Sequence, residues 1–199
     1  MGKVEFSQLS KADIIFTTSA ANESAAIRQA TGSIISHTIL VTEANKVIEA
    51  IAPTVIEHSW DDALTHAQAT VAIVYRRKGL TNGADQDKVV AAARKFNNLP
   101  YDYLGAAGAG MPGNTRNQVV AGVGCSIIIL TPACLAAGGT IANNARDSNA
   151  DKKFFCSELV ARAFSIAGFP IVDGKATFAN PNTVLISPHL DYVGHLVGG

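Results

Sequence analysis

Residues 155–164, FCSELVARAF, set a cysteine at the start of a helix and decide how the second half of the chain is interpreted. Apolar residues at helical spacing follow Cys156, while Gly168 and Pro170 are typical of a helix end. The free amides and the positive dipole end of a helix stabilise a thiolate over a thiol, so Cys156 is a candidate nucleophile. The alternative is that Cys156 only packs, as most free cysteines do.

The overall composition describes one globular domain without a preferred polyanionic partner. Hydrophobic residues make up 48% of the 199 positions and charged residues 16%, enough apolar material for a substantial core. Sixteen basic residues balance sixteen acidic ones, which argues against nucleic acid or an anionic membrane surface as partner.

The three cysteines do not form a disulfide framework in a chain of this length. Cys125 and Cys134 lie in a charge-free apolar run, where we expect them to pack. No spacing typical of zinc sites occurs, so we expect no metal and no cofactor. Residues 1–8 lack the apolar stretch of a signal peptide, which favours a cytoplasmic protein as synthesised. Export by a signal-independent secretion system stays open.

Hydrophobic periodicity predicts a mixture of strands and helices. Strands are expected at residues 12–17, 34–41, 47–51 and 70–76, with one more short strand in the tail. Helices are expected at residues 20–29, 60–67, 85–96 and 155–167, with Ser59 as the cap of the second.

A histidine and a glutamate fall on the two strands of the predicted hairpin. A thiolate nucleophile needs an imidazole partner with an orienting group, and His37 begins the first of these strands. With the three-residue loop 43–45, His37 and Glu49 share one sheet face as diagonal neighbours, and Asn45 takes the left-handed position. A two- or four-residue loop would turn Glu49 to the opposite face. An edge strand facing solvent explains Glu49 almost as well.

The remaining histidines are weaker candidates. His58 and His66 flank the segment around Trp60 and are interpreted as surface residues, while His189 and His195 lie in the tail.

The middle of the chain has a different composition. Residues 105–113 are almost entirely glycine and alanine, and residues 119–142 carry no charge. The second run is long enough to span a bilayer, but glycines and Pro132 interrupt it and no basic flank anchors it. We therefore interpret residues 1–199 as one domain with an apolar insertion at about 105–150, buried rather than in contact with a membrane.

Five short motifs occur in an order that resembles one family of hydrolases. They are DIIF at 13–16, SHTI at 36–39, VIEA at 47–50, LPYDY at 99–103 and FCSELV at 155–160. This order is similar to that of the permuted papain-like hydrolases of the NlpC/P60 superfamily, particularly the YiiX/YebB-like branch. In that branch the histidine strand precedes the cysteine, as His37 precedes Cys156 here.

The resemblance implies an α+β fold in which an antiparallel sheet or barrel packs against the nucleophile helix. It also implies Cys156 as nucleophile, His37 as general base and then acid, and Glu49 as the group that orients His37. Tyr101 and Tyr103 would line the substrate cleft, and the neighbours of the two reacting residues, Ser36 and Ser157, are further candidates for substrate binding. The long segment 105–151 departs from the family's pattern.

The expected activity is that of a cysteine amidase or peptidase which forms a thioester acyl-enzyme. Peptides or peptidoglycan fragments, with bacterial cell-wall stem peptides foremost, are the substrate class that the resemblance implies, and a secreted antibacterial effector is one setting. A lipid-directed thioesterase or acyltransferase is the alternative within enzymes. A non-catalytic protein that binds a peptide or lipid, or that perturbs membranes through residues 119–142, is the alternative outside them. The oligomeric state stays undetermined.

Overall fold

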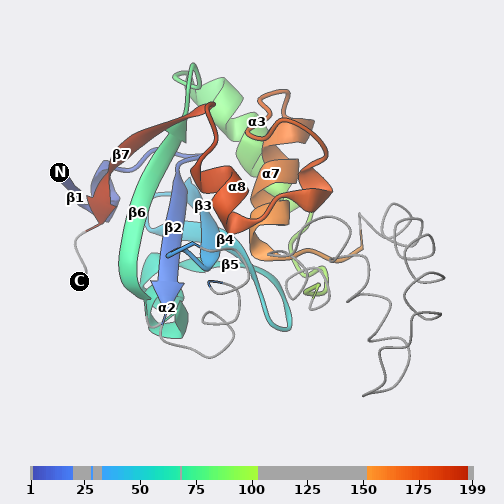
Figure 1. Cartoon of the computed structure of the whole chain (residues 1–199), viewed down its shortest axis with the longest axis horizontal. Coiled ribbons are helices and arrows are strands. Elements are labelled where there is room, and N and C mark those ends of the chain that lie inside the picture. Colours follow the sequence, from blue (N-terminus) through green and yellow to red (C-terminus); the bar gives the residue numbers. More distant parts are fainter. Residues whose placement is uncertain (1, 20–27, 29–32, 68, 103–151, 197–199) are drawn as a thin grey trace.

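A computed structural model gives the structure of residues 2–19, 28, 33–67, 69–102 and 152–196, and all structural statements concern these (Figure 1). The strands are β1 (Lys3–Val4), β2 (Ile14–Ser19), β3 (His37–Glu43), β4 (Lys46–Ile51), β5 (Thr54–Ser59), β6 (Ala69–Arg77) and β7 (Leu190–Leu196). The α-helices are α2 (Trp60–Ala67), α3 (Gly83–Arg94), α7 (Cys156–Ile166) and α8 (Pro181–Leu185), and the 3₁₀ helices are η1 (Phe6–Gln8) and η2 (Ala176–Phe178).

The described strands form one sheet in the order β1-β7-β6-β2-β3-β4-β5. Five neighbouring pairs are antiparallel, and β1 with β7 is the parallel pair among the described strands. The sheet is open, with β1 and β5 at its edges, and is not closed into a barrel. The α+β class expected from the sequence is confirmed, and of the two expected sheet forms the open one is present.

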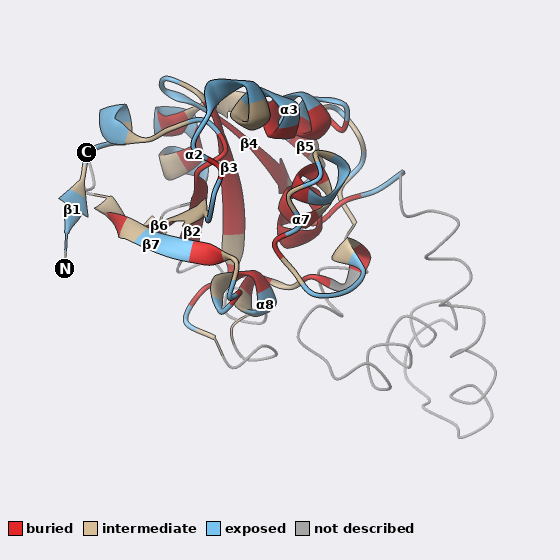
Figure 2. Cartoon of the chain, turned by 90° about the horizontal axis from the view of Figure 1, so that it is seen from above, coloured by how far each residue is buried: buried red, intermediate tan, exposed pale blue. Residues whose placement is uncertain are grey.

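The two faces of the sheet are buried by different helices (Figure 2). On one face, Leu159 and Phe164 of α7 pack with Ile14, Phe16 and Leu40 of the sheet in a single core cluster. The cluster on the opposite face is smaller and contains the following residues of the sheet and of α2: Ile15, Ile39, Val41, Val47, Val74, Trp60 and Ala63. Alternate residues of β2 and β3 therefore serve the two faces, as strand geometry requires.

Helix α7 forms where the sequence predicts it and ends just before the predicted glycine, Gly168. Eight of its residues from Cys156 to Phe164 are buried, which explains the apolar spacing. Gly168 follows the helix with a φ of 86°, a conformation that glycine adopts without strain. Phe155 precedes the helix and supplies no capping side chain, so the first-turn amides are left without a side-chain acceptor from that residue.

The β3–β4 hairpin has the register that the sequence predicts, but a different turn produces it. Only Ala44 and Asn45 separate the strands, and a register shift between Val41 and Glu43 takes up the additional residue. Beyond this bulge Val41 faces Val47, so Glu49 remains on the same face as it would with a three-residue loop. Asn45 has a φ of 58°, which confirms its predicted left-handed conformation.

The structure also contains two strands, β1 and β5, that the sequence interpretation missed, and several predictions fall outside the described residues. Strand β5 lies at Thr54–Ser59, directly before the predicted helix α2, whose start Ser59 caps by accepting the Asp62 amide at 3.1 Å. Outside the described residues lie most of the predicted helix 20–29, the insertion 105–150 with Cys125 and Cys134, and Tyr103. Within the described residues, no helix combines the length and apolar character needed to cross a membrane.

Candidate active site

The first two candidate residues meet across the hairpin. His37 is the first residue of β3, and its Nε2 atom is hydrogen-bonded to Oε2 of Glu49 in the middle of β4. The Glu49 side chain is 1% exposed and the His37 side chain 17% exposed. The imidazole thus has a carboxylate partner in a setting from which water is largely excluded, where such a hydrogen bond is strong.

Cys156 occupies the first position of α7 and is a free, buried cysteine. It is 2% exposed, and with Phe155 it forms a small cluster against which Tyr101 packs. The charge of Cys156 and its hydrogen bonding both raise the pKa of His37, so the sulfur lies beside the imidazole ring. Because Nε2 of His37 faces Glu49, the other ring nitrogen, Nδ1, is the atom left for the sulfur. The structure therefore brings Cys156, His37 and Glu49 into one chain of contacts.

The pKa values of His37 and Glu49 are displaced in opposite directions. Burial lowers the pKa of His37, but the charge and hydrogen bond of Cys156, followed by those of Glu49, outweigh burial and raise this pKa from 6.5 to about 10. Burial raises the pKa of Glu49, but hydrogen bonds and charge from His37 and His58 outweigh burial and lower this pKa from 4.5 to about 2. Glu49 is therefore a carboxylate and His37 an imidazolium at neutral pH.

A second histidine, which the sequence interpretation placed at the surface, completes the partners of Glu49. His58 lies near the end of β5, its side chain is 10% exposed, and its Nε2 atom is 2.6 Å from Oε1 of Glu49. The surface interpretation of His58 is thus wrong. The missed signal is the strand itself: β5 pairs with β4 so that His58 faces Val47, two residues from Glu49 and on the same face.

The four residues expected to bind substrate have different surroundings. Tyr101 packs against the cluster of Phe155 and Cys156 and forms an isolated bridge with Phe154, and its predicted role in substrate binding stays a prediction. The Ser157 hydroxyl is buried and donates to the carbonyl of Ala179 at 3.0 Å, so it ties α7 to the segment after η2. The buried Ser36 hydroxyl has no hydrogen-bond partner among the described residues. Tyr103 lies outside them.

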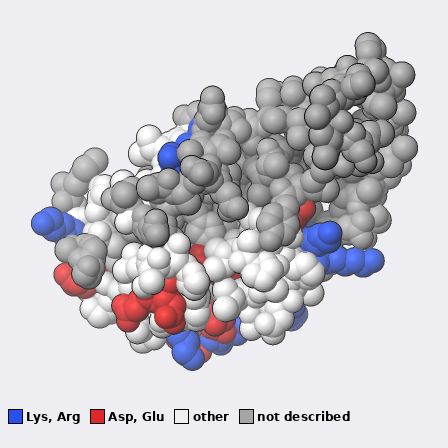
Figure 3. Space-filling view, turned by 90° about the horizontal axis from the view of Figure 1, so that it is seen from below, with Lys and Arg blue, Asp and Glu red and all other residues white. Residues whose placement is uncertain are grey.

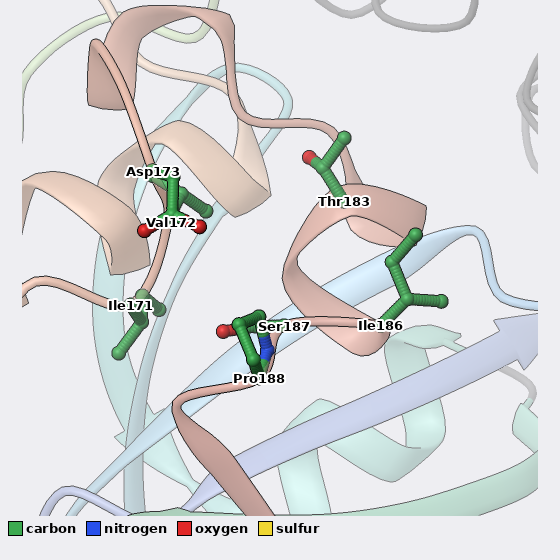
Figure 4. A pocket seen from close by; sticks show the side chains of 7 residues that line it. All are labelled: Ile171, Val172, Asp173, Thr183, Ile186, Ser187 and Pro188. Carbon is green, nitrogen blue, oxygen red and sulfur yellow. The ribbon is translucent and has the colours of Figure 1, made fainter.

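A shallow pocket of about 230 Å³ lies between the segment that follows α7 and the turn around α8 (Figure 4). The segment after α7 and the turn around α8 supply its walls, and Asp173 at one side bonds to His189 at 2.9 Å. The complete lining is Ile171, Val172, Asp173, Thr183, Ile186, Ser187 and Pro188. It contains none of the residues predicted to react or to bind substrate.

The described residues do not offer a metal site. Among them, no three His, Cys, Asp or Glu side chains form a group that could hold a metal ion. The Nε2 atoms of His37 and His58 are both hydrogen-bonded to the Glu49 carboxylate.

Comparison with known proteins agrees with the fold. No protein-family model matches the sequence, and no curated protein matches it either. Among solved structures, the chain is similar to that of the metalloprotein YiiX from Escherichia coli O157:H7, with a TM-score of 0.62 and 19% sequence identity over 94% of this chain and 97% of that chain. This similarity confirms the expected resemblance to the YiiX-like branch at the level of the fold.

Proposed function

We propose that this protein is a cysteine hydrolase in which Cys156 attacks an amide carbonyl of a small peptide. The observation that carries the proposal is the uninterrupted chain of contacts from Cys156 through His37 to Glu49. A nucleophile, an imidazole and an orienting acceptor in this order are the arrangement that covalent acyl transfer requires. Similarity of fold alone would not support it, because one fold can host unrelated activities.

The raised pKa of His37 defines the first step. His37 holds its proton at neutral pH, and in the proposed reaction Cys156 attacks as the thiolate form that a neighbouring imidazolium favours. The sulfur adds to the carbonyl carbon, and the amide of Cys156 in the first turn of α7 is the proposed donor to the negative charge that develops on the carbonyl oxygen. His37 then donates its proton to the leaving amine as the C–N bond breaks, which leaves a thioester and a neutral imidazole.

Hydrolysis of the thioester uses the same groups in reverse. The neutral His37 accepts a proton from water, the hydroxide equivalent adds to the thioester carbonyl, and the C–S bond breaks to release a carboxylic acid and the Cys156 thiolate. His37 is again an imidazolium beside a thiolate, as at the start. Glu49 remains ionised throughout and stabilises the positive charge of His37.

The test is hydrolysis of a panel of short peptides by the purified protein, with cell-wall stem peptides first because the family resemblance favours them. Phospholipids and acyl esters belong in the same panel, because the charge-free run at 119–142 favours the alternative of a lipid-directed acyl hydrolase. We expect product with one of these classes and none with the Cys156→Ala or His37→Ala proteins. Unchanged turnover by a folded Cys156→Ala protein would contradict the proposal.

A further inference from the structure

The Glu49 carboxylate has two nitrogen partners on two different strands. Oε2 is bonded to His37 of β3 and Oε1 to His58 of β5, so both oxygens of this buried group are used. The three side chains come from three consecutive neighbours in the sheet, β3, β4 and β5. An ionised carboxylate accepts at both oxygens but donates from neither, so each imidazole must present an N–H to it.

Glu49 would have freedom of orientation if His37 were its sole partner. A glutamate has three side-chain torsions, and its carboxylate can rotate about the last of them at little cost. The bond to His58 at 2.6 Å fixes the second oxygen, and with it the plane of the carboxylate. His58 itself is held by its place in β5, where regular pairing runs from Lys46 opposite Ser59 to Ile51 opposite Thr54.

We propose that His58 is a positioning residue of the catalytic group, which holds Glu49 so that its other oxygen stays directed at Nε2 of His37. His58 does not touch the substrate or the sulfur and acts through Glu49 alone. The role of His58 in catalysis rests on the proposed function. Its effect on the His37–Cys156 pair, however, can be measured without a substrate.

A purely structural role is the competing explanation. A buried carboxylate requires partners, and the loss of one N–H donor costs stability whether or not the carboxylate orients a catalytic group. The test must therefore read the state of His37 and Cys156 as well as the stability of the protein.

The experiment compares His58→Ala, which removes the N–H donor, with His58→Gln, which restores an N–H donor that does not titrate. His66→Ala is the matched control, because the exposed His66 ring lies 6.3 Å from the His58 ring and is not bonded to Glu49. Two quantities are measured at each variant: the rate of Cys156 alkylation by iodoacetamide at neutral pH, and the His37 titration by NMR.

We expect His58→Ala to slow alkylation by about 10-fold, a modest part of the 10²–10⁴ that acid–base groups contribute to catalysis. We also expect it to lower the titration midpoint of His37, whereas His58→Gln restores most of the rate and His66→Ala changes neither quantity. Where a substrate is known, the loss with His58→Ala should appear in kcat with KM nearly unchanged.

Alkylation and titration that match the wild type in a folded but less stable His58→Ala protein would overturn the inference and leave His58 a purely structural residue. If His58→Ala does not fold, ¹⁵N spectra of the unaltered protein decide, because the inference requires a proton on Nε2 of His58 and an Nε2 without one contradicts it. These readings stand whether or not any peptide is hydrolysed, so failure of this inference is distinguishable from failure of the proposed function.

Discussion

His37 can act in two directions because its two ring nitrogens face different partners. Nε2 is bonded to the Glu49 carboxylate, and the side of the ring left over faces Cys156. A positive imidazolium between two negative groups is more stable than a neutral one, even though the site is buried. His37 is therefore protonated at neutral pH, and in the proposed reaction this proton goes to the leaving amine.

Removing the sulfur should expose this dependence directly. In Cys156→Ala the largest influence that raises the pKa of His37 is lost, so we expect its midpoint to fall well below the wild-type value of about 10. NMR titration of the two proteins measures the difference. Equal midpoints would show that Cys156 carries no charge that His37 senses.

The same pair predicts how stability depends on alkaline pH. A group whose pKa is raised by folding contributes stability that is complete below its unfolded value and is lost as pH rises through its folded value. For His37 this window extends from about 6.5 to about 10. Urea unfolding at pH 6 and pH 10 should therefore show a larger loss of unfolding free energy for wild type than for Cys156→Ala.

Glu49 predicts the opposite dependence on the acid side. Its pKa is lowered from 4.5 to about 2, so its contribution to stability is present above pH 4.5 and is lost as pH falls toward 2. Glu49→Gln cannot titrate, and its unfolding free energy should fall less steeply over this range. Parallel acid-unfolding curves for the two proteins would contradict the assignment. We expect Glu49→Gln to retain weak activity, because the amide can still accept a hydrogen bond from His37 but carries no charge to stabilise it.

At the scale of elements, the β3–β4 hairpin shows which features of the site follow from the sequence. The sequence placed His37 and Glu49 on one face only if the loop had three residues, and the structure reaches the same register through a two-residue turn with a bulge. The left-handed conformation of Asn45 was predicted correctly. The bulge that achieves this register has no signal of its own in the residues around Thr42. His58 was missed for a related reason: β5 has no regular apolar alternation, and pairing with β4, a tertiary contact, determines where its side chains point.

The turn at Asn45 gives a test of this element. Asn45 has a φ of 58°, which a β-branched residue adopts only with strain, so Asn45→Val should lower the unfolding free energy by about 1 kcal/mol or more. Asn45→Gly, which removes the strain altogether, should leave the stability close to that of wild type. Thermal unfolding of both variants provides the comparison, and equal melting temperatures for the valine and glycine proteins would count against it.

The edge formed by β1 and β7 depends on a glycine. A β-carbon at Gly194 would lie 2.7 Å from Cγ1 of Val4 and 2.8 Å from the carbonyl oxygen of Gly2, which is closer than such atoms approach in proteins. We expect Gly194→Ala to separate the two strands at a cost of about 1–3 kcal/mol. Gly2→Ala is the matched control, because nothing lies within 4 Å of its added carbon. Hydrogen exchange of the His195 amide, which donates to Gly2, reports the pairing directly.

At the scale of the whole molecule, the site joins parts of the chain that are far apart in sequence. The histidine and glutamate come from the first quarter of the chain and the cysteine from α7, more than one hundred residues later. The family resemblance carried by the motif order implied this meeting, whereas the local sequence indicates the type of each element and not which distant elements come together. Both charge signs occur on the face shown in Figure 3, in keeping with the balanced composition, so charge alone selects no class of substrate.

The sheet that supports the site is tied together by a buried ion pair. Asp13 precedes β2, is 0% exposed, and accepts two hydrogen bonds from Arg76 of β6, at 2.6 and 2.7 Å. Its Oδ2 atom also accepts the Ser10 amide at 2.8 Å. This pair joins residues that are 63 positions apart in the sequence, on the central strands of the sheet. Its loss should therefore lower the free energy of unfolding of the whole domain.

Arg76→Ala should therefore destabilise the entire domain, because it leaves a buried carboxylate without its charged partner. Since Arg76 is 35% exposed, we expect a loss toward the lower end of the range of about 3–5 kcal/mol measured for broken buried pairs. Arg76→Lys should recover part of it, because an ammonium supplies the charge but not the two parallel N–H bonds.

Arg94→Ala is the comparison at a solvent-exposed site. Arg94 bonds to Glu57 and Glu43 at the surface, where water replaces lost partners, so the melting temperature should change much less than with Arg76→Ala. Urea unfolding followed by both tryptophan fluorescence and circular dichroism measures whether the sheet and its helices unfold together. An equal loss of stability in Arg76→Ala and Arg94→Ala would contradict this expectation. It would mean that other groups in the sheet replace Arg76 as partners of the Asp13 carboxylate.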